Sequence, residues 1–219
     1  KNIIIISEKK DNFLFNLSKQ YNLFYIEHKN SIGGRYSVLS ETGIIPSFLM
    51  GVNTKRLRSN LLMILKGNNK KFFKRSVISL TKILSSTRYN NLIFLNYSPE
   101  LEKFLFWLQQ LVAESLGKKN KGFLPLISNA PKDHHSLLQL YLDGPKDKIF
   151  YIFSAENKSK VKININRNIK DKDFLKNKFL QTVKNAQKNA LIQTLVTKKI
   201  PFRLFNIKRI DESVLGSLF

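Results

Sequence analysis

The chain has 219 residues, 42% of them hydrophobic, which suffices to bury one sizeable core or two small ones and argues against a disordered chain. It contains no cysteine, which excludes disulfide scaffolds and thiolate metal sites and is compatible with a reducing compartment. No apolar run approaches the roughly 20 residues of a membrane span, and no secretory signal follows the first residue. We therefore expect a cytoplasmic protein without membrane contact. Because the chain begins with Lys1, we also expect it to be a piece of a longer protein.

Basic residues strongly outnumber acidic ones. The 38 Lys and Arg against 15 Asp and Glu give a net charge of +23 and a pI near 10.2, a balance typical of proteins that bind nucleic acid or an anionic surface. The lysines are spread over every segment rather than gathered in one basic arm, so we expect no specific nucleic-acid partner. A nucleic-acid binder remains an alternative, and it would require a contiguous basic face.

In chain order, the first part of the sequence alternates a strand, a helix and a strand and then becomes helical. The strands have short β-branched runs, and the helices have apolar residues three and four positions apart. A turn is predicted at the paired glycines 33 and 34. The predicted ranges are strand 3–6, helix 10–20, strand 23–26, and helices 40–50, 55–66 and 71–86, the last three separated by 51–53 and 67–69.

From residue 91 strands and helices alternate again, and several of these strands are apolar on both faces. The predicted strands are 92–95, 123–127, 149–153, 161–165 and 201–207, and the predicted helices are 99–116, 133–142 and 173–197. This alternation predicts an α/β protein with a mostly parallel sheet flanked by helices on both faces. Ligands collect at the carboxyl ends of strands in such sheets, so we expect chemistry in the loops before Pro99 and Asp133.

The predicted helix 99–116 is apolar nearly all round, which is typical of a helix buried on every side. Gln110 and Glu114 interrupt this pattern and share one face, because they are four residues apart. Burial raises the pKa of a carboxyl group toward the range in which it can act as a base, so Glu114 is a candidate catalytic residue. The alternative is a solvated Glu114 near the helix end, or one paired with Lys118.

Two further segments could carry chemistry. Asp133 is a predicted N-cap that places His134 and His135 in a first helical turn, where the dipole favours a neutral imidazole. Adjacent histidines point in different directions, so we expect no metal site, and a capped helix with exposed histidines is the alternative. Gly34 and Arg35 offer backbone N–H groups and a guanidinium to an anion, although a tight turn with a surface arginine explains them equally well.

Taken together, these segments resemble three signature blocks of the glucose-6-phosphate isomerase family. The blocks occur in the family's order, and the tail 211–218 is similar to the segment before the family's C-terminal active-site region. The resemblance implies a sugar-isomerase (SIS) fold, which is a flavodoxin-like three-layer arrangement. The three blocks read Ile-Gly-Gly-Arg-Tyr-Ser-Val-Leu-Ser at 32–40 with Gly-Ile-Ile-Pro at 43–46, Trp-Leu-Gln-Gln-Leu-Val-Ala-Glu-Ser-Leu-Gly-Lys at 107–118, and Asp-His-His-Ser-Leu-Leu-Gln-Leu-Tyr-Leu-Asp-Gly-Pro at 133–145.

The resemblance also implies a role for each candidate residue. Glu114 matches the base that moves a proton between C2 and C1 of the open-chain sugar through an enediol. Arg35, beside Gly34 in the substrate-binding segment, matches the arginine that stabilises the enediolate. His135 matches the histidine that assists ring opening from the neighbouring subunit of a homodimer, and Gln110 matches the glutamine near the substrate phosphate. The implied substrate is a sugar phosphate, and no cofactor or metal is implied.

The chain also departs from the family. The Ser/Thr-rich phosphate loop of the first SIS domain and the C-terminal lysine are missing, and Glu41-Thr42 replaces residues that are usually small or apolar. We therefore expect 1–51 to be the tail of the first SIS domain, 52–88 a helical connector and 89–219 the second SIS domain. We expect this portion to be inactive alone. A non-catalytic phosphosugar-binding SIS module is the alternative to an isomerase.

Overall fold

The computed structural model describes residues 2–86, 88–156, 161–164 and 174–219, which form two compact units. The first unit contains residues 1–73 and 210–219, and the second contains residues 74–209. The division falls inside one helix, α5 (Gly67–Ser85), so it does not coincide with the expected borders at 51 and 88. Those borders stay a prediction about domain ancestry. Within the described ranges, no helix combines the length and the apolar character that crossing a bilayer requires.

The first unit begins with the predicted strand, helix and strand. Strands β1 (Ile4–Ser7) and β2 (Phe24–Glu27) pair in parallel, and α1 (Phe13–Gln20) crosses between them. Asn12 is the N-cap of α1, and its side-chain oxygen accepts a hydrogen bond from the Phe15 N–H at 2.9 Å. The local sequence therefore determines this βαβ element as expected.

The helices that follow differ from the prediction in one place. The 3-10 helix η1 (Gly34–Leu39) and α2 (Glu41–Leu49) follow the glycine turn, but the helix expected at 55–66 is broken into α3 (Thr54–Leu57) and α4 (Leu61–Ile64). Asn60 lies at the break, and its amide donates to Ser213 Oγ at 2.7 Å. A side chain engaged by a distant segment thus overrides the helical pattern. The expected separator 67–69 is instead the first turn of α5.

A C-terminal helix that the sequence reading did not predict, α9 (Glu212–Leu218), completes the first unit. Asp211 caps it by accepting from the Val214 N–H at 3.0 Å, and the same carboxylate accepts from Arg56 Nη2 at 2.8 Å. Gly216 lies directly on α3, where an added Cβ would be 1.7 Å from the Leu57 carbonyl oxygen. The α3–α9 contact therefore requires a glycine at this position.

The loop that carries the glycine pair is closed by a histidine. His28 Nδ1 contacts Glu41 Oε1, and His28 Nε2 lies 3.0 Å from the Ile32 carbonyl oxygen. Both partners are acceptors, so both ring nitrogens donate only when the imidazole is protonated. The hydrogen bond to Glu41 accordingly raises the pKa of His28, and Glu8 adds a smaller effect in the same direction. Glu41, which the family pattern does not expect, thus has a structural partner.

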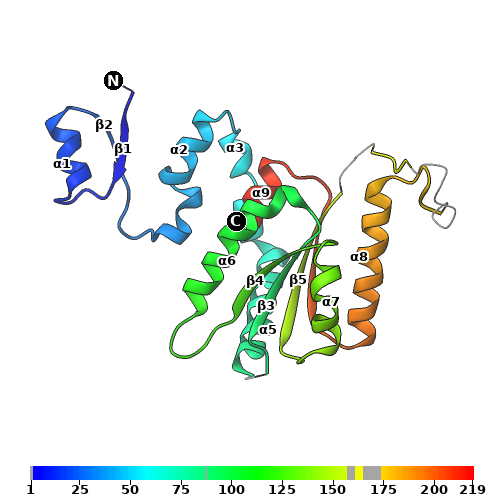
Figure 1. Cartoon of the computed structure of the whole chain (residues 1–219). Helices are drawn as coiled ribbons and strands as arrows, with labels where there is room; N and C mark the ends of the chain where they lie inside the picture. The colour runs from blue at the N-terminus through cyan, green and yellow to red at the C-terminus, as the bar shows by residue number, and fades with distance from the viewer. Residues whose placement is uncertain (1, 87, 157–160, 165–173) are drawn as a thin grey trace. The chain divides into compact units, whose positions relative to one another are not determined.

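The second unit is one parallel four-stranded sheet with strand order β4-β3-β5-β6 (Figure 1). Because each helix that joins two strands of this sheet returns the chain to the opposite edge, these helices run antiparallel to the strands. After the end of α5 the unit contains β3 (Asn91–Asn96), η2 (Pro99–Leu101), α6 (Glu102–Leu116), β4 (Leu124–Asn129), α7 (His134–Asp143), β5 (Lys148–Ala155), α8 (Leu180–Thr197) and β6 (Phe202–Ile207).

Helices cover both faces of this sheet, as predicted. On one face, Ile93 and Ile152 pack in a single core with Tyr141 of α7 and Leu191 of α8, which lie beside each other in Figure 1. On the other face, Phe153 contacts Phe104 of α6 and stacks on Phe205, and the centroids of the last pair are 4.6 Å apart. Right-handed crossovers account for this arrangement. The chain moves from β3 to β4 in one direction along the sheet and from β5 to β6 in the other, so α6 and α8 lie on opposite faces.

The segment between β5 and α8 departs from the prediction. Residues 161–164 form no strand, and their sheet-like pairing is one antiparallel bridge between Lys162 and Phe179. Helix α8 begins at Leu180 rather than at 173, and residues 165 and 173 lie outside the described part. The strand predicted from alternating apolar residues at 161–165 is therefore not formed at 161–164, because such a pattern does not show whether a neighbouring strand is available for pairing.

The α3–α9 contact predicts a cost for Gly216→Ala. The added methyl group overlaps the backbone of Leu57, which cannot rotate away as a side chain would, so we expect a loss of about 1 to 3 kcal/mol in the free energy of unfolding. Urea denaturation measures this loss. Gly33→Ala is the matched control, because its Cβ would meet Tyr36 at an ordinary 3.7 Å. An equal effect of both substitutions would contradict the close approach.

The His28 pair predicts a pH dependence. The folded pKa lies above the unfolded value near 6.5, so this contribution to stability is complete below about pH 6.5 and is lost as the pH rises through the folded pKa. We expect the stability difference between the wild type and His28→Gln to shrink from about pH 6 to about pH 8. Urea denaturation at each pH measures it, and a difference that grows with pH would oppose the assignment.

Candidate functional site

Three strand ends at the carboxyl edge of the second unit are joined by polar side chains. Asn96, at the end of β3, donates to Asn129 Oδ1 at the end of β4 at 3.2 Å and accepts from the Ser98 N–H at 2.9 Å. Ser98 Oγ in turn accepts from the Ala155 N–H at the end of β5, at 2.6 Å. These bonds hold the loop after β3 in one position, at the edge where parallel sheets place their ligands.

The first turn of α7 is anchored to this network. The Tyr97 hydroxyl, fully buried, lies 2.8 Å from His134 Nε2. Burial raises the pKa of Tyr97 and lowers that of His134, so the hydroxyl donates to a neutral imidazole. Asp133 occupies the N-cap position, but its carboxylate does not cap the helix as expected. It accepts instead from the Asn129 N–H at 2.7 Å, because the preceding turn brings that donor closer.

The two histidines diverge as predicted. His134 is half-buried against Tyr97, whereas His135 is exposed at the carboxyl edge of the sheet. His134 is therefore engaged by Tyr97, whereas the His135 imidazole is accessible to solvent. Within the described ranges, no three His, Asp or Glu side chains come close enough together to hold a metal ion.

Gln110 and Glu114 meet on α6, as their spacing predicts. Gln110 Nε2 donates to Glu114 Oε1 at 2.8 Å. The expectation of a helix buried on every side is wrong, however. Glu114 is exposed and the Phe106 side chain is 49% exposed, because α6 covers the sheet with Phe104 and Leu105 while its opposite face meets solvent. The Glu114 carboxylate is therefore exposed to water in this chain.

Topology separates Glu114 from His135. Helix α6 starts at the carboxyl edge of the sheet and runs back, so Glu114 lies twelve residues, roughly 18 Å of helix, from its start at Glu102. His135 lies in the first turn of α7, at the carboxyl edge itself. The end of α6 and the start of α7, where these two residues occur, thus lie toward opposite edges of the sheet, and Figure 1 shows the run of both helices. One copy of the second unit does not bring them to a common site.

Gly34 and Arg35 lie in the first unit, at the start of η1. The Arg35 guanidinium lies 5.6 Å from the Tyr36 ring centroid, and a Cβ at Gly34 would meet nothing within 4 Å. The space around Gly34 is therefore open to a ligand.

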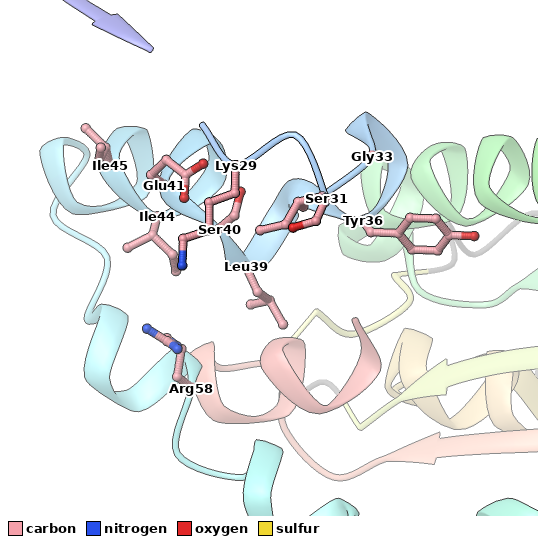
Figure 2. Close-up of a pocket in the computed structure, with 11 residues that line it drawn as sticks. Lys29, Ser31, Gly33, Tyr36, Leu39, Ser40, Glu41, Ile44, Ile45 and Arg58 are labelled. Carbon is pink, nitrogen blue, oxygen red and sulfur yellow. The ribbon is translucent and has the colours of Figure 1, made fainter. Parts of the chain in front are cut away.

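A cavity of about 720 Å³ begins at the neighbouring Gly33 and Tyr36. Figure 2 shows Lys29 and Arg58 among the apolar side chains Leu39 and Ile44 that line it. The cavity combines two cations and an apolar wall with one carboxylate, Glu41, whose charge is partly offset by its contact with His28, so it could hold an organic molecule that carries an anionic group.

Several polar residues were missed by the sequence reading. Asn96, Ser98 and Asn129 carry a detectable signal, since each lies at or just after the end of an apolar strand. Lys188 carries no such signal. It lies on α8 with only 8% of its surface exposed and donates to Ser154 Oγ at 2.9 Å, and burial lowers its pKa. A lysine among many in a basic helix cannot be recognised as buried from the sequence.

Curated proteins with similar sequences share one name. The chain is 30% identical to the glucose-6-phosphate isomerase of Mycoplasmopsis synoviae over 99% of its own length and 52% of the relative's. It is 32% identical to the glucose-6-phosphate isomerase of Campylobacter jejuni over 86% of its own length and 48% of the relative's. The chain thus spans about half the length of these curated relatives. No protein-family model matches it.

Solved structures show the same fold. A hypothetical protein, TT0462 of Thermus thermophilus, superposes with a TM-score of 0.83 at 22% identity, over 98% of this chain and 54% of that one. A glucose-6-phosphate isomerase from Chlamydia trachomatis superposes with a TM-score of 0.61 at 16% identity, over 98% of this chain and 45% of that one. The relatives that align with 99% and 86% of the chain are both named glucose-6-phosphate isomerase, and the chain therefore belongs to the glucose-6-phosphate isomerase family.

Proposed function

We propose that the chain supplies half of a cytoplasmic glucose-6-phosphate isomerase, which interconverts glucose 6-phosphate and fructose 6-phosphate without cofactor or metal. The observation that carries this proposal is the match of 99% of the chain to a relative of that name. The relatives are about twice as long, so the activity requires the half of their length that this chain does not span. The isolated chain is then inactive.

Glu114 is the proposed base. Its carboxylate takes the proton from C2 of the open-chain aldose, the C2 electrons form the enediol double bond, and the carbonyl oxygen at C1 gains a proton. Returning the C2 proton to C1, while the hydroxyl at C2 loses its proton and becomes the carbonyl, gives the ketose. One proton thus moves from C2 to C1 and the proton lost from O2 balances the one gained at O1, so no atom is gained or lost. The hydrogen bond from the Gln110 amide orients the Glu114 carboxylate on the helix. Arg35 stabilises the negative charge on the enediolate oxygens, as a fixed cation beside a developing oxyanion does.

His135 is proposed to assist ring opening in the active site of a second copy. The sheet topology supports this assignment, because Glu114 and His135 lie toward opposite edges of one unit. An exposed imidazole on the first turn of α7 is available to another subunit, and Tyr97 fixes that turn through His134. A homodimer with two shared sites satisfies both constraints.

Exposed apolar surface supports a larger assembly. Phe106 on α6 is 49% exposed, and Phe24 on β2 is 66% exposed beside a sheet of only two described strands. Two-stranded sheets are marginal alone and gain stability when further strands or helices cover them. Covering the open face of α6 would also remove water from around the Glu114 carboxylate, which strengthens its electrostatic interaction with a bound substrate.

The solvated Glu114 favours one alternative, a non-catalytic module that binds phosphosugars. Such a module needs no base, and it would bind glucose 6-phosphate without exchanging the C2 hydrogen with solvent. Exchange at C2 therefore distinguishes the two functions, and it is measurable by NMR in deuterated water even where net conversion is slow.

The base assignment predicts a large effect of Glu114→Gln. In the isomerase formed by this chain and the half that its relatives contain, we expect turnover to fall by about 10² to 10⁴, because the amide cannot accept the C2 proton. A coupled dehydrogenase assay measures turnover. The matched control is Glu102→Gln, which makes the same change on the first turn of α6 and should leave turnover unchanged. Wild-type turnover in Glu114→Gln would disprove the role.

If each active site combines Glu114 of one copy with His135 of the other, two inactive variants should complement each other. When Glu114→Gln and His135→Asn forms of the isomerase, each with the half that its relatives contain, assemble at random, about half of the dimers are mixed, and each mixed dimer has one intact site if His135 acts across the interface. About a quarter of the wild-type activity should return. If His135 acts within its own subunit, every site carries one lesion and no activity returns.

A further inference from the structure

A basic pocket lies at the amino edge of the second unit's sheet, opposite the edge that holds His135. It has a volume of about 70 Å³ and lies between the end of α7, the start of β5 and the turn from α8 to β6, at the lower ends of α7 and α8 in Figure 1. Neither the isomerase chemistry nor the residues assigned to it involve this pocket. Its charged lining residues, all basic, are Arg88, Lys146, Lys148, Lys198 and Lys199.

Negative groups around the pocket do not balance these five cations. Lys198 Nζ donates to Asp143 at 2.7 Å and lowers the pKa of that carboxyl group, and Lys148 Nζ donates to Asp147 at 2.6 Å. The C-termini of α7 and α8 each add about half a negative charge. Together these account for about three negative charges, which leaves a surplus of about two positive charges at the pocket.

Lys148 gives the pocket a fixed donor. Only 8% of its surface is exposed, and its ammonium is held by the Pro145 carbonyl oxygen at 3.1 Å and by Asp147. An ammonium has three N–H donors, so one donor of this buried group has no partner among the described residues. A buried, already oriented cation costs little further entropy when it binds an anion.

The walls and the size limit what the pocket accepts. The Tyr141 ring and two prolines, Pro145 and Pro201, make rigid apolar walls, and the volume holds about five water molecules. That space suits one tetrahedral group of five heavy atoms rather than a sugar ring. We propose that this pocket binds a single dianionic phosphate group, either as the free ion or as the end of a phosphomonoester.

The test titrates inorganic phosphate into the full chain at low ionic strength and follows the backbone amides of Lys148 and Ile200 by NMR. We expect saturable shifts, and the double variant Lys146→Gln/Lys199→Gln should raise the Kd about tenfold or more. Both lysines are exposed, so the substitutions spare the core. The matched control is Lys119→Gln/Lys121→Gln. It removes the same charge elsewhere, and Lys119 and Lys199 share a backbone φ of 54°. Its Kd should stay within about twofold.

Each outcome decides the proposal. Binding of free phosphate alone assigns the ion, and comparable binding of glucose 6-phosphate at the same amides assigns a phosphomonoester, so both support the site. Equal weakening in the two double variants would overturn it, because it would indicate only the general positive field. A DNA duplex that displaces phosphate equally in both variants would also overturn it. Because Glu114 and Arg35 are untouched, failure here leaves the isomerase proposal standing.

Discussion

The direction of the crossover helices determines what the second unit can do. Two successive strands of a parallel sheet must be joined by an element that returns to the opposite edge, so a residue's position along such a helix decides which edge it lies near. The central strand β3, whose Ile93, Phe94 and Leu95 have no exposed surface, is paired on both sides and fixes this frame. A residue early in α7 and one late in α6 consequently face different surroundings, whatever their sequence separation.

That constraint connects the fold to the proposed chemistry. A base near the far end of α6 and an imidazole at the start of α7 cannot cooperate inside one unit, whereas two copies can exchange them. The network of Asn96, Ser98 and Asn129 holds the strand ends, and Tyr97 ties His134 to it. The backbone position of the exposed His135 is therefore fixed by its buried neighbours.

Much of this arrangement could be read from the sequence, and the failures have specific causes. The strands β3 and β5 and the helices α6 and α7 follow from apolar patterning, and the Gln110–Glu114 contact follows from helical spacing. Patterning counts apolar residues but does not say what covers them, so the sequence left open whether Glu114 is buried or solvated. Long-range contacts were equally hidden. Asn60 breaks a helix because Ser213 lies beside it, and the buried Lys188 ammonium has a partner because Ser154 Oγ accepts a hydrogen bond from it.

The return of residues 210–219 to the first unit has a consequence for biosynthesis. The second unit is one continuous stretch of chain, so it can fold while translation is still under way. The first unit can close only after α9 has left the ribosome, because Arg56 must find Asp211 across 155 residues. Between these two events, the surface of α3 against which Gly216 packs is exposed to solvent. Transiently exposed surface promotes aggregation, so we expect the nascent chain to be most prone to aggregate in this interval.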